Sequence, residues 1–244
     1  MAFTVAVVGA SGRLGSVISG VVRSTPEAQL IAELGSKDPI EAALVADVVV
    51  DATHPAVSPE IVAAVVAEGK RVLVGTSGWS ETRLASLRTQ VAERPGSAAI
   101  VIPNFSLGSA LATGFATIAA RHFGSAEIIE AHHAGKIDSP SGTAVRTAEL
   151  MARAAPRPFS APHVDQRARG QQVGGVPIHS LRLDGVVARQ EVRFGGTGET
   201  LTIVHDTLSD TSYEAGIRAS LLRTAEISDE VVVGLDAVLG LTFS

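Results

Sequence analysis

Short apolar runs alternate with longer amphipathic segments through the first hundred residues. Five runs are typical of buried parallel strands: residues 3–8, 29–34, 48–51, 71–74 and 98–102. Four segments carry apolar positions at helical spacing: residues 13–23, 40–44, 59–68 and 81–93. Strands that alternate with helices predict right-handed crossovers and a parallel sheet. The pattern therefore predicts a Rossmann-like α/β domain.

The pattern changes after Pro103. It predicts a long apolar helix at 108–123, a strand at 126–132 and a helix at 141–155. Residues 156–175 are rich in Pro, Gly, Arg and Gln, which predicts a mobile loop. Three antiparallel strands are expected to follow, near 177–184, 187–194 and 200–206, with turns at Asp184-Gly185 and Gly195-Gly196. We expect an α+β domain with a mixed, largely antiparallel sheet.

The last part of the chain returns to a helical pattern. A helix near 214–226 and a short apolar tail are expected to pack back on the first domain. We therefore predict one domain from residues 1–104 and 215–244, and a second from residues 105–214.

Composition narrows the class of protein. Of 244 residues, 45% are hydrophobic and 18% charged, enough apolar material for a folded core. The formal net charge is −5 without a basic block, which argues against a nucleic-acid partner. The absence of cysteine excludes disulfides, thiolate metal sites and a cysteine nucleophile. We expect no leader peptide and no membrane span, hence a cytoplasmic protein.

The segment VVGASGRLGSVI places three glycines between the first strand and the first helix. Gly9 allows a tight turn, Gly12 lets the backbone approach a pyrophosphate, and Gly15 lets helix and strand pack closely. Phosphates would then bind free N–H groups of the helix. The context predicts dinucleotide binding rather than ordinary turn glycines.

Cofactor preference is usually set at the tip of the second strand, where an acid bonds the ribose hydroxyls of NAD. Here the tip reads Gly35-Ser36-Lys37. Lys37 and Arg13 could instead meet a 2′-phosphate, and we hypothesise that NADPH is used at least as well as NADH. The alternative is that both side chains are solvated surface charges.

Further polar residues follow the strand ends at which open α/β sheets bind ligands. Four of them are suitably placed to bind a nicotinamide: Thr53, Thr76, Ser77 and Asn104. Any one of them alone is more often a turn or cap residue.

The segment EAHHAGKIDSPSGTA, residues 130–144, concentrates the chemistry of the second domain. His132 and His133 are adjacent and face opposite ways, and zinc-type spacing is missing, so we expect no catalytic metal. Lys136 adds positive charge, and histidine can donate a proton near neutral pH. Ser141 or Thr143 is a plausible N-cap, and the N–H groups of Gly142 and Thr143 at the helix start would bind a carboxylate. The segment predicts a proton-donating site for a small dicarboxylate.

These motifs, together with GTSGW, IPNFSLG and EVRFGGTGETLTIVHD, closely resemble the dihydrodipicolinate (4-hydroxy-tetrahydrodipicolinate) reductases of the bacterial diaminopimelate and lysine pathway. The resemblance extends over essentially the whole chain and is strongest to actinobacterial members. It implies NADPH- or NADH-dependent reduction of a cyclic unsaturated dicarboxylate at C4. It also implies a dinucleotide-binding first domain and a second domain that binds substrate and joins a homotetramer through its sheet.

The resemblance also implies residue roles. His132 matches the proton donor, and Lys136 matches a second donor that contacts substrate. His133, Gly142 and Thr143 match carboxylate-binding positions, to which we add Ser141. The cofactor segments correspond to three stretches: Gly9, Ala10, Ser11, Gly12, Arg13 and Leu14; Gly75, Thr76 and Ser77; and Ile102, Pro103, Asn104 and Phe105.

The chain departs from its relatives at two places. Gly35 replaces an acid, and Ser11 stands where some members have lysine, so cofactor preference stays open. Two other functions are also considered: another two-domain Rossmann dehydrogenase for amino acids or semialdehydes, and a dinucleotide-sensing regulator. Neither explains a His/Lys pair beside Ser141-Gly142-Thr143.

Overall fold

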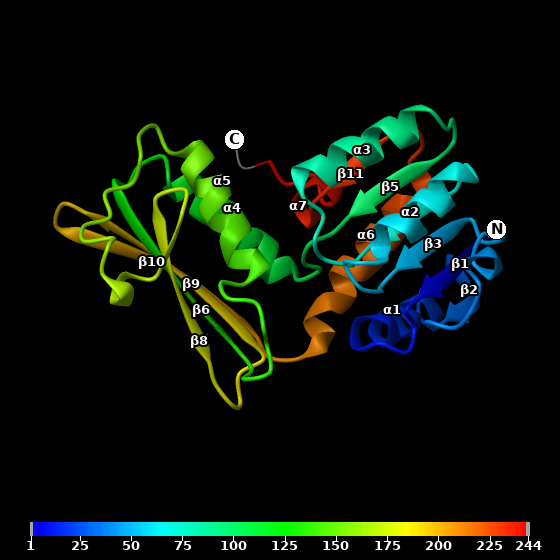
Figure 1. The fold of residues 1–244 in the computed structure, drawn as a ribbon, viewed down its shortest axis with the longest axis horizontal. Coiled ribbons are helices and arrows are strands. Elements are labelled where there is room, and N and C mark those ends of the chain that lie inside the picture. The colour runs from blue at the N-terminus through cyan, green and yellow to red at the C-terminus, as the bar shows by residue number, and fades with distance from the viewer. Residues whose placement is uncertain (1, 243–244) are drawn as a thin grey trace. The chain divides into compact units, whose positions relative to one another are not determined.

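The computed structural model describes residues 2–242 and divides them into two compact units (Figure 1). Unit 1 consists of the chain up to Leu107 together with Tyr213–Leu241, and unit 2 consists mainly of Gly108–Ser212.

Unit 1 is built on a six-stranded parallel sheet with the strand order β11-β5-β4-β3-β1-β2. Its strands are β1 (Phe3–Val8), β2 (Ala28–Leu34), β3 (Val48–Asp51), β4 (Arg71–Val74), β5 (Ala98–Val101) and β11 (Val231–Val233). The sheet is the predicted Rossmann-like one. The strand β11 was not predicted, because three apolar residues in a tail carry too little periodicity to specify a strand.

Helices cover both faces of this sheet (Figure 1). They are α1 (Arg13–Arg23), α2 (Ser58–Ala67), α3 (Glu81–Ala92), α6 (Glu214–Glu226) and the short α7 (Leu235–Val238), with a 3₁₀ turn η1 (Ile40–Ala42). Helices α2 and α3 pack side by side against one face, and α1 packs beside α6 on the other. This arrangement leaves the carboxyl ends of the strands for ligand binding.

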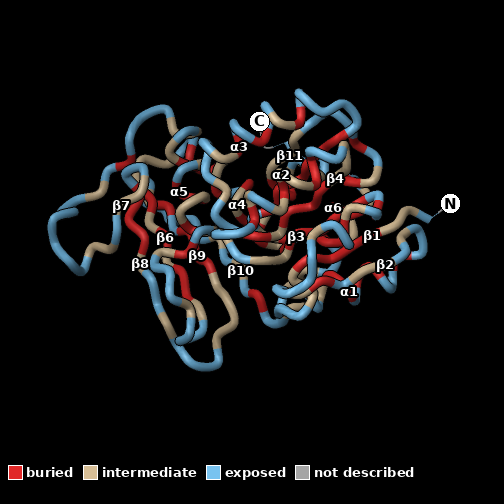
Figure 2. The backbone as a smooth tube through the Cα atoms, turned by 45° about the vertical axis from the view of Figure 1, so that its right-hand side comes forward, coloured by how far each residue is buried: buried red, intermediate tan, exposed pale blue. Residues whose placement is uncertain are grey.

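Burial follows from this covering. Strands β3 and β5 are buried at every residue, whereas the edge strand β2 alternates between exposed and partly buried positions. Figure 2 shows buried segments concentrated in the central strands. Continuous Val and Ala runs such as VVVD are typical of strands that are covered on both faces.

Unit 2 contains a five-stranded mixed sheet with the order β10-β9-β6-β8-β7. Its strands are β6 (Ser125–His132), β7 (Gln171–Val173), β8 (Val176–Arg182), β9 (Ala188–Gly196) and β10 (Glu199–Thr207). Its other elements are α4 (Leu107–Ala119), α5 (Gly142–Ala154) and the 3₁₀ turns η2 (Arg167–Arg169) and η3 (Asp210–Tyr213). Small residues of α4 and α5 pack on Ile128, Ile178 and Phe194 of one sheet face. The α+β prediction with a mixed sheet is confirmed.

Three details of the predicted unit 2 are wrong. Strand β8 pairs in parallel with β6, which lies between β8 and β9, so the strands near 177–184 and 187–194 are not a hairpin. The turn before β10 lies at Gly198, with φ of +79°, and Gly195-Gly196 belong to β9. Residues 171–173 form a strand within the segment predicted as a loop. Turn residues mark a change of direction but not which strand becomes the neighbour.

Within residues 2–242, no helix is both long enough and apolar enough to cross a membrane.

Candidate active site

The glycine loop of unit 1 has the geometry of a phosphate-binding turn. Gly9 has φ of +84°, and a Cβ there would lie 2.4 Å from the Ala52 carbonyl oxygen. A Cβ at Gly15 would lie 2.1 Å from the Gly9 carbonyl oxygen, so only glycine allows α1 to start this close to β1. The first turn of α1 carries no acidic side chain among the described residues, and Gly12 is its N-cap. Its positive end therefore suits an anion.

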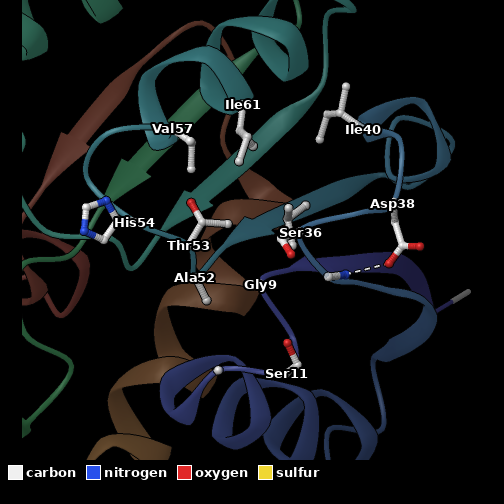
Figure 3. A pocket seen from close by; sticks show the side chains of 13 residues that line it. Gly9, Ser11, Ser36, Asp38, Ile40, Ala52, Thr53, His54, Val57 and Ile61 are labelled. Atoms are coloured by element: carbon white, nitrogen blue, oxygen red, sulfur yellow. Dashed lines mark hydrogen bonds between the residues drawn. The ribbon is translucent and has the colours of Figure 1, made fainter.

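A cavity of about 630 Å³ opens beside this loop (Figure 3). Gly9 and Ser11 form one side, and Ile40, Val57 and Ile61 supply apolar surface. Gly12 also lines the cavity. The remaining lining residues come from the ends of β1, β2 and β3: Val8, Gly35, Ser36, Asp38, Ala52, Thr53 and His54. An apolar wall opposite a glycine-rich turn fits a dinucleotide, whose adenine is apolar on its faces and whose phosphates are charged.

The charged residues near the second strand tip divide between the cavity and the surface. Asp38 lines the cavity, and its Oδ2 accepts a hydrogen bond from the Gly35 backbone N–H at 2.7 Å. Lys37 and Arg13 are exposed, and neither is among the residues that line the cavity. The sequence analysis missed Asp38, because the acid was expected at the position of Gly35 itself.

Three predicted cofactor segments meet at the carboxyl end of the sheet. A Cβ at Gly75 would lie 2.9 Å from the Phe105 ring and 3.1 Å from the Leu14 side chain. The Thr53 backbone N–H donates to Thr76 Oγ1 at 2.9 Å. Asn104 Oδ1 accepts from the Ser106 N–H at 2.9 Å. The glycine loop, the loop that carries Thr53 and the segments 75–77 and 102–105 therefore lie together.

The buried carboxylate of Asp51 organises the loop after β3, which sequence reasoning also missed. Asp51 is fully buried, and its side chain accepts hydrogen bonds from the Thr53 N–H, at 3.1 Å, and from the Ser58 hydroxyl. These bonds fix Thr53 and the start of α2 at the cavity wall.

In unit 2, strand β6 ends in the predicted histidine pair. His132 Nδ1 lies 2.6 Å from Glu130 Oε2, while His133 is exposed. Glu130 and His132 are two positions apart on the strand, so their side chains lie on the same face of the sheet. The two adjacent histidines therefore have different surroundings.

The loop after His133 brings cationic and N–H donors around one carboxylate. Lys136 Nζ lies 2.7 Å from Asp138 Oδ1, and the Gly142 backbone N–H also hydrogen-bonds to Asp138. Burial raises the pKa of the Asp138 carboxyl, but the hydrogen bond and the positive charge of Lys136 outweigh it, with smaller contributions from the backbone N–H groups of Asp138 and Gly142, and the pKa is lowered. Ser141 is the N-cap of α5, with its hydroxyl accepting from the Ala144 N–H at 3.3 Å. The Asp138 side chain is 57% exposed, so a ligand carboxylate can exchange with it.

Glu130 is the second buried carboxylate that the sequence analysis overlooked. It is fully buried and bonded to both terminal nitrogens of Arg182, each at 3.0 Å. Burial alone raises the pKa of the Glu130 carboxyl, but hydrogen bonds from His132, Arg182 and Ser180 outweigh it and lower the pKa to about 2. The carboxylate is therefore ionised at any pH near neutrality. The segment EAHH did show Glu130 and His132 on one strand face, whereas no local signal pointed to Arg182, 52 residues away.

The class of protein follows from two features: a Rossmann-like unit with a glycine loop suited to a dinucleotide, and a second unit whose loop places His132 and Lys136 beside carboxylates. These are the features of an NAD(P)-dependent oxidoreductase. Family models refine this class: the model described as "Dihydrodipicolinate reductase, N-terminus" matches residues 3–105, and "Dihydrodipicolinate reductase, C-terminus" matches residues 108–239. The chain belongs to the dihydrodipicolinate reductase family.

Curated relatives and a solved structure agree with this family. The 4-hydroxy-tetrahydrodipicolinate reductase of Clavibacter michiganensis subsp. michiganensis is 56% identical over 99% of this chain and 87% of its own length. The reductase of Streptomyces griseus subsp. griseus is 44% identical over 90% of this chain and 91% of its own. The dipicolinate-bound dihydrodipicolinate reductase from Paenisporosarcina sp. TG-14 superposes with a TM-score of 0.81 at 32% identity, covering 97% of this chain and 99% of that chain. The alternative dehydrogenase and regulator functions are not favoured.

Proposed function

We propose that this chain reduces 4-hydroxy-tetrahydrodipicolinate to tetrahydrodipicolinate with NADPH or NADH, and that residues 130–144 hold the substrate and supply the proton. One observation carries the proposal: Lys136 and the Gly142 N–H at the start of α5 already bind a carboxylate, that of Asp138. The same loop begins with His132 on a buried carboxylate. A dicarboxylate site needs cationic and N–H donors such as those of Lys136 and Gly142, and protonation needs a proton donor such as His132.

Each residue of the loop has a distinct role in this proposal. Lys136 and the N–H groups of Gly142 and Thr143 bind one substrate carboxylate after Asp138 turns away, with Ser141 shaping the helix start. Exposed His133 contacts a substrate carboxylate. His132 donates the proton that the reduced ring requires, and Lys136 is a second donor. The unreduced ring loses water at C4 before it is reduced.

The nicotinamide cofactor fits unit 1 because the glycine loop lines the cavity and leads into the N-terminus of α1, whose first turn has no acidic side chain among the described residues. When bound, it supplies the hydride that adds to C4 of the ring. The chain would hold its phosphates with the loop from Gly9 to Leu14 and its nicotinamide with the segments 75–77 and 102–105 and with Thr53. The protein contributes orientation and exclusion of water.

Cofactor choice is expected to depend on Asp38. Its carboxylate in the cavity favours ribose hydroxyls over a 2′-phosphate, whereas Arg13 and Lys37 nearby favour the phosphate. We expect wild type to use both cofactors, and Asp38→Asn to raise kcat/KM for NADPH relative to NADH by about tenfold, the effect of about 1.4 kcal/mol. Steady-state rates with each cofactor measure the ratio. If neither Asp38→Asn nor Lys37→Ala changed the ratio of kcat/KM for NADPH to that for NADH, the cofactor preference would depend on other residues.

We also propose a cytoplasmic homotetramer that forms through the sheet of unit 2. The sheet face opposite α4 and α5 exposes Leu181 and Val204, 39% and 44% accessible, beside the ion pairs of Arg189 with Asp206 and Glu191. Apolar patches with a charged rim are typical of interfaces. Light scattering should give four times the 25.0 kDa chain mass.

The test of the proposed reaction is the loss of NADPH or NADH absorbance with substrate made in situ from pyruvate and aspartate semialdehyde. Oxidation that depends on this substrate supports the proposal and also gives the cofactor ratio. Binding of cofactor without any oxidation would keep the dinucleotide site and refute the assigned reaction.

Loss of the proton donor should affect turnover rather than binding. We expect His132→Ala to lower kcat by roughly a hundredfold to ten-thousandfold, the usual contribution of a general acid, with a smaller change in KM. Its neighbour provides the matched control: His133→Ala should raise KM more than it lowers kcat. A KM effect alone in His132→Ala would make His132 a binding residue.

A further inference from the structure

Glu130 occupies a position at which an apolar side chain would satisfy the fold. It lies on the sheet face that Ile128 shares, under helix α5, and it is fully buried. Burying a carboxylate is unfavourable unless it is paired, and buried ion pairs on average add little stability over apolar residues of similar size. The carboxylate therefore needs an explanation other than core packing.

The contacts of Glu130 point to that explanation. Oε2 of Glu130 lies 2.6 Å from His132 Nδ1 and accepts a hydrogen bond from Arg182 Nη1 at 3.0 Å. Oε1 accepts hydrogen bonds from Arg182 Nη2 at 3.0 Å and from the Ser141 N–H at 3.2 Å. One carboxylate thus contacts both the proton donor and the N-cap residue of α5. The arginine meets it with a two-pronged geometry that fixes direction as well as distance.

Arg182 extends the same network to the loop backbone. It pairs across the sheet with His132, and its Nε donates to the Lys136 carbonyl oxygen at 3.2 Å. Nη2 of Arg182 also donates a hydrogen bond to the Asp138 carbonyl oxygen. The backbone that carries Lys136 and Asp138 is therefore bound to the same guanidinium that holds Glu130.

We propose that Glu130 and Arg182 are positioning residues of the reductase: Glu130 accepts the Nδ1–H of His132, so that Nε2 faces the substrate, and Arg182 locks the Lys136 loop and α5 in register with it. This role rests on the proposed function. A hydrogen bond from Nδ1–H to a carboxylate fixes the ring tautomer, because the imidazole keeps its proton on the nitrogen that faces the acceptor. Nε2 is then the nitrogen that takes up the second ring proton and gives it to the substrate. Neither residue contacts the reacting atoms in this proposal. Each acts through His132 or Lys136.

The sheet contains a matched control for this network. Glu127, on the opposite face of β6, also pairs with a histidine and an arginine: its Oε2 lies 2.8 Å from His179 Nε2, and Oε1 bonds to Arg169. Glu127→Gln removes a similar ion pair from the same strand without touching the loop. Glu127 is 35% exposed whereas Glu130 is buried, so melting temperature is measured for both variants, and a merely structural role would lower kcat only in proportion to lost stability.

The experiment compares Glu130→Gln and Glu127→Gln with wild type in kcat, KM, melting temperature and the ¹⁵N resonances of the histidine rings. We expect Glu130→Gln to lower kcat roughly tenfold to a hundredfold, the usual cost of removing a partner that orients a functional histidine, with a smaller change in KM. We expect the His132 ring to carry its proton on Nδ1 in wild type and to lose that preference in Glu130→Gln. Glu127→Gln should leave both kcat and the position of the His132 ring proton unchanged.

Three results would overturn the proposal. The first is a folded Glu130→Gln protein with wild-type kcat. The second is an equal loss of kcat in both variants, in step with melting temperature. The third is a wild-type His132 ring that carries its proton on Nε2 with Nδ1 unprotonated. This result needs no variant, so it contradicts the proposal even when Glu130→Gln does not fold. The ring resonances are read without turnover, so they test the positioning separately from the proposed reaction.

Discussion

The Gly15→Ala variant is expected to lose most of its cofactor affinity and part of its stability. A Cβ at this position would lie 2.1 Å from the Gly9 carbonyl oxygen and 2.8 Å from the Ala10 Cα, so backbone must move to admit it. Overpacking of this kind costs about 1–3 kcal/mol, which exceeds the gain of at most about 1 kcal/mol from replacing glycine by alanine in a helix. Moving the start of α1 also displaces the N–H groups that would bind phosphate.

The same helix provides the control for Gly15. Gly20 is exposed on α1, and a Cβ there would meet no atom within 4 Å. We expect Gly20→Ala to keep its cofactor affinity and to gain up to about 1 kcal/mol of stability. Fluorescence titration with NADH and thermal unfolding measure both effects. Equal cofactor affinity in Gly15→Ala and wild type would contradict the phosphate-binding role of the glycine loop.

The Lys136→Ala variant is expected to lose nearly all turnover and little stability. Lys136 combines carboxylate binding with proton donation in the proposed reaction, so we expect kcat/KM to fall by roughly a thousandfold or more, within the range for removal of a catalytic acid. Its ion pair with Asp138 is partly exposed and is worth at most about 1 kcal/mol. That loss corresponds to a melting-temperature decrease of about 2–4 °C in a chain of this size.

Lys70 is the matched lysine for this test. It precedes β4 at the amino end of the sheet, away from the ends where ligands bind. Lys70→Ala should keep wild-type kcat/KM. A large decrease in melting temperature in Lys136→Ala, with activity falling in proportion, would instead indicate that Lys136 holds the loop together.

Periodicity predicted most elements of the fold because the central strands of unit 1, such as β3 and β5, are buried at every residue, and helices such as α1 and α2 bury apolar positions at helical spacing. The run Arg71–Val74 matched β4 in full, and Ser141, one of the two expected N-caps, is the N-cap of α5. The order of strands in unit 2 could not be read in this way. On one side β8 pairs with β6, some 50 residues away in the sequence, and this pairing depends on tertiary contacts and not on local turn chemistry.

The candidate site shows the same division between local and long-range information. The residues proposed to bind ligand lie in compact motifs, and the glycine loop and the segment 130–144 displayed most of them directly. The residues that support them, Glu130, Arg182, Asp51 and Asp38, reveal their parts only through partners and cavities in the folded chain. A buried carboxylate is not distinguishable from a surface one in a sequence.

The measurement that tests the central claim most directly is a calorimetric titration of dipicolinate into wild type, Lys136→Ala and Lys70→Ala, each with NADH present. The account predicts that wild type and Lys70→Ala bind dipicolinate alike, and that Lys136→Ala binds it about tenfold to a hundredfold more weakly, as expected for losing a charged hydrogen-bond donor. Equal affinity in all three proteins would contradict the assignment of residues 130–144 as the dicarboxylate site.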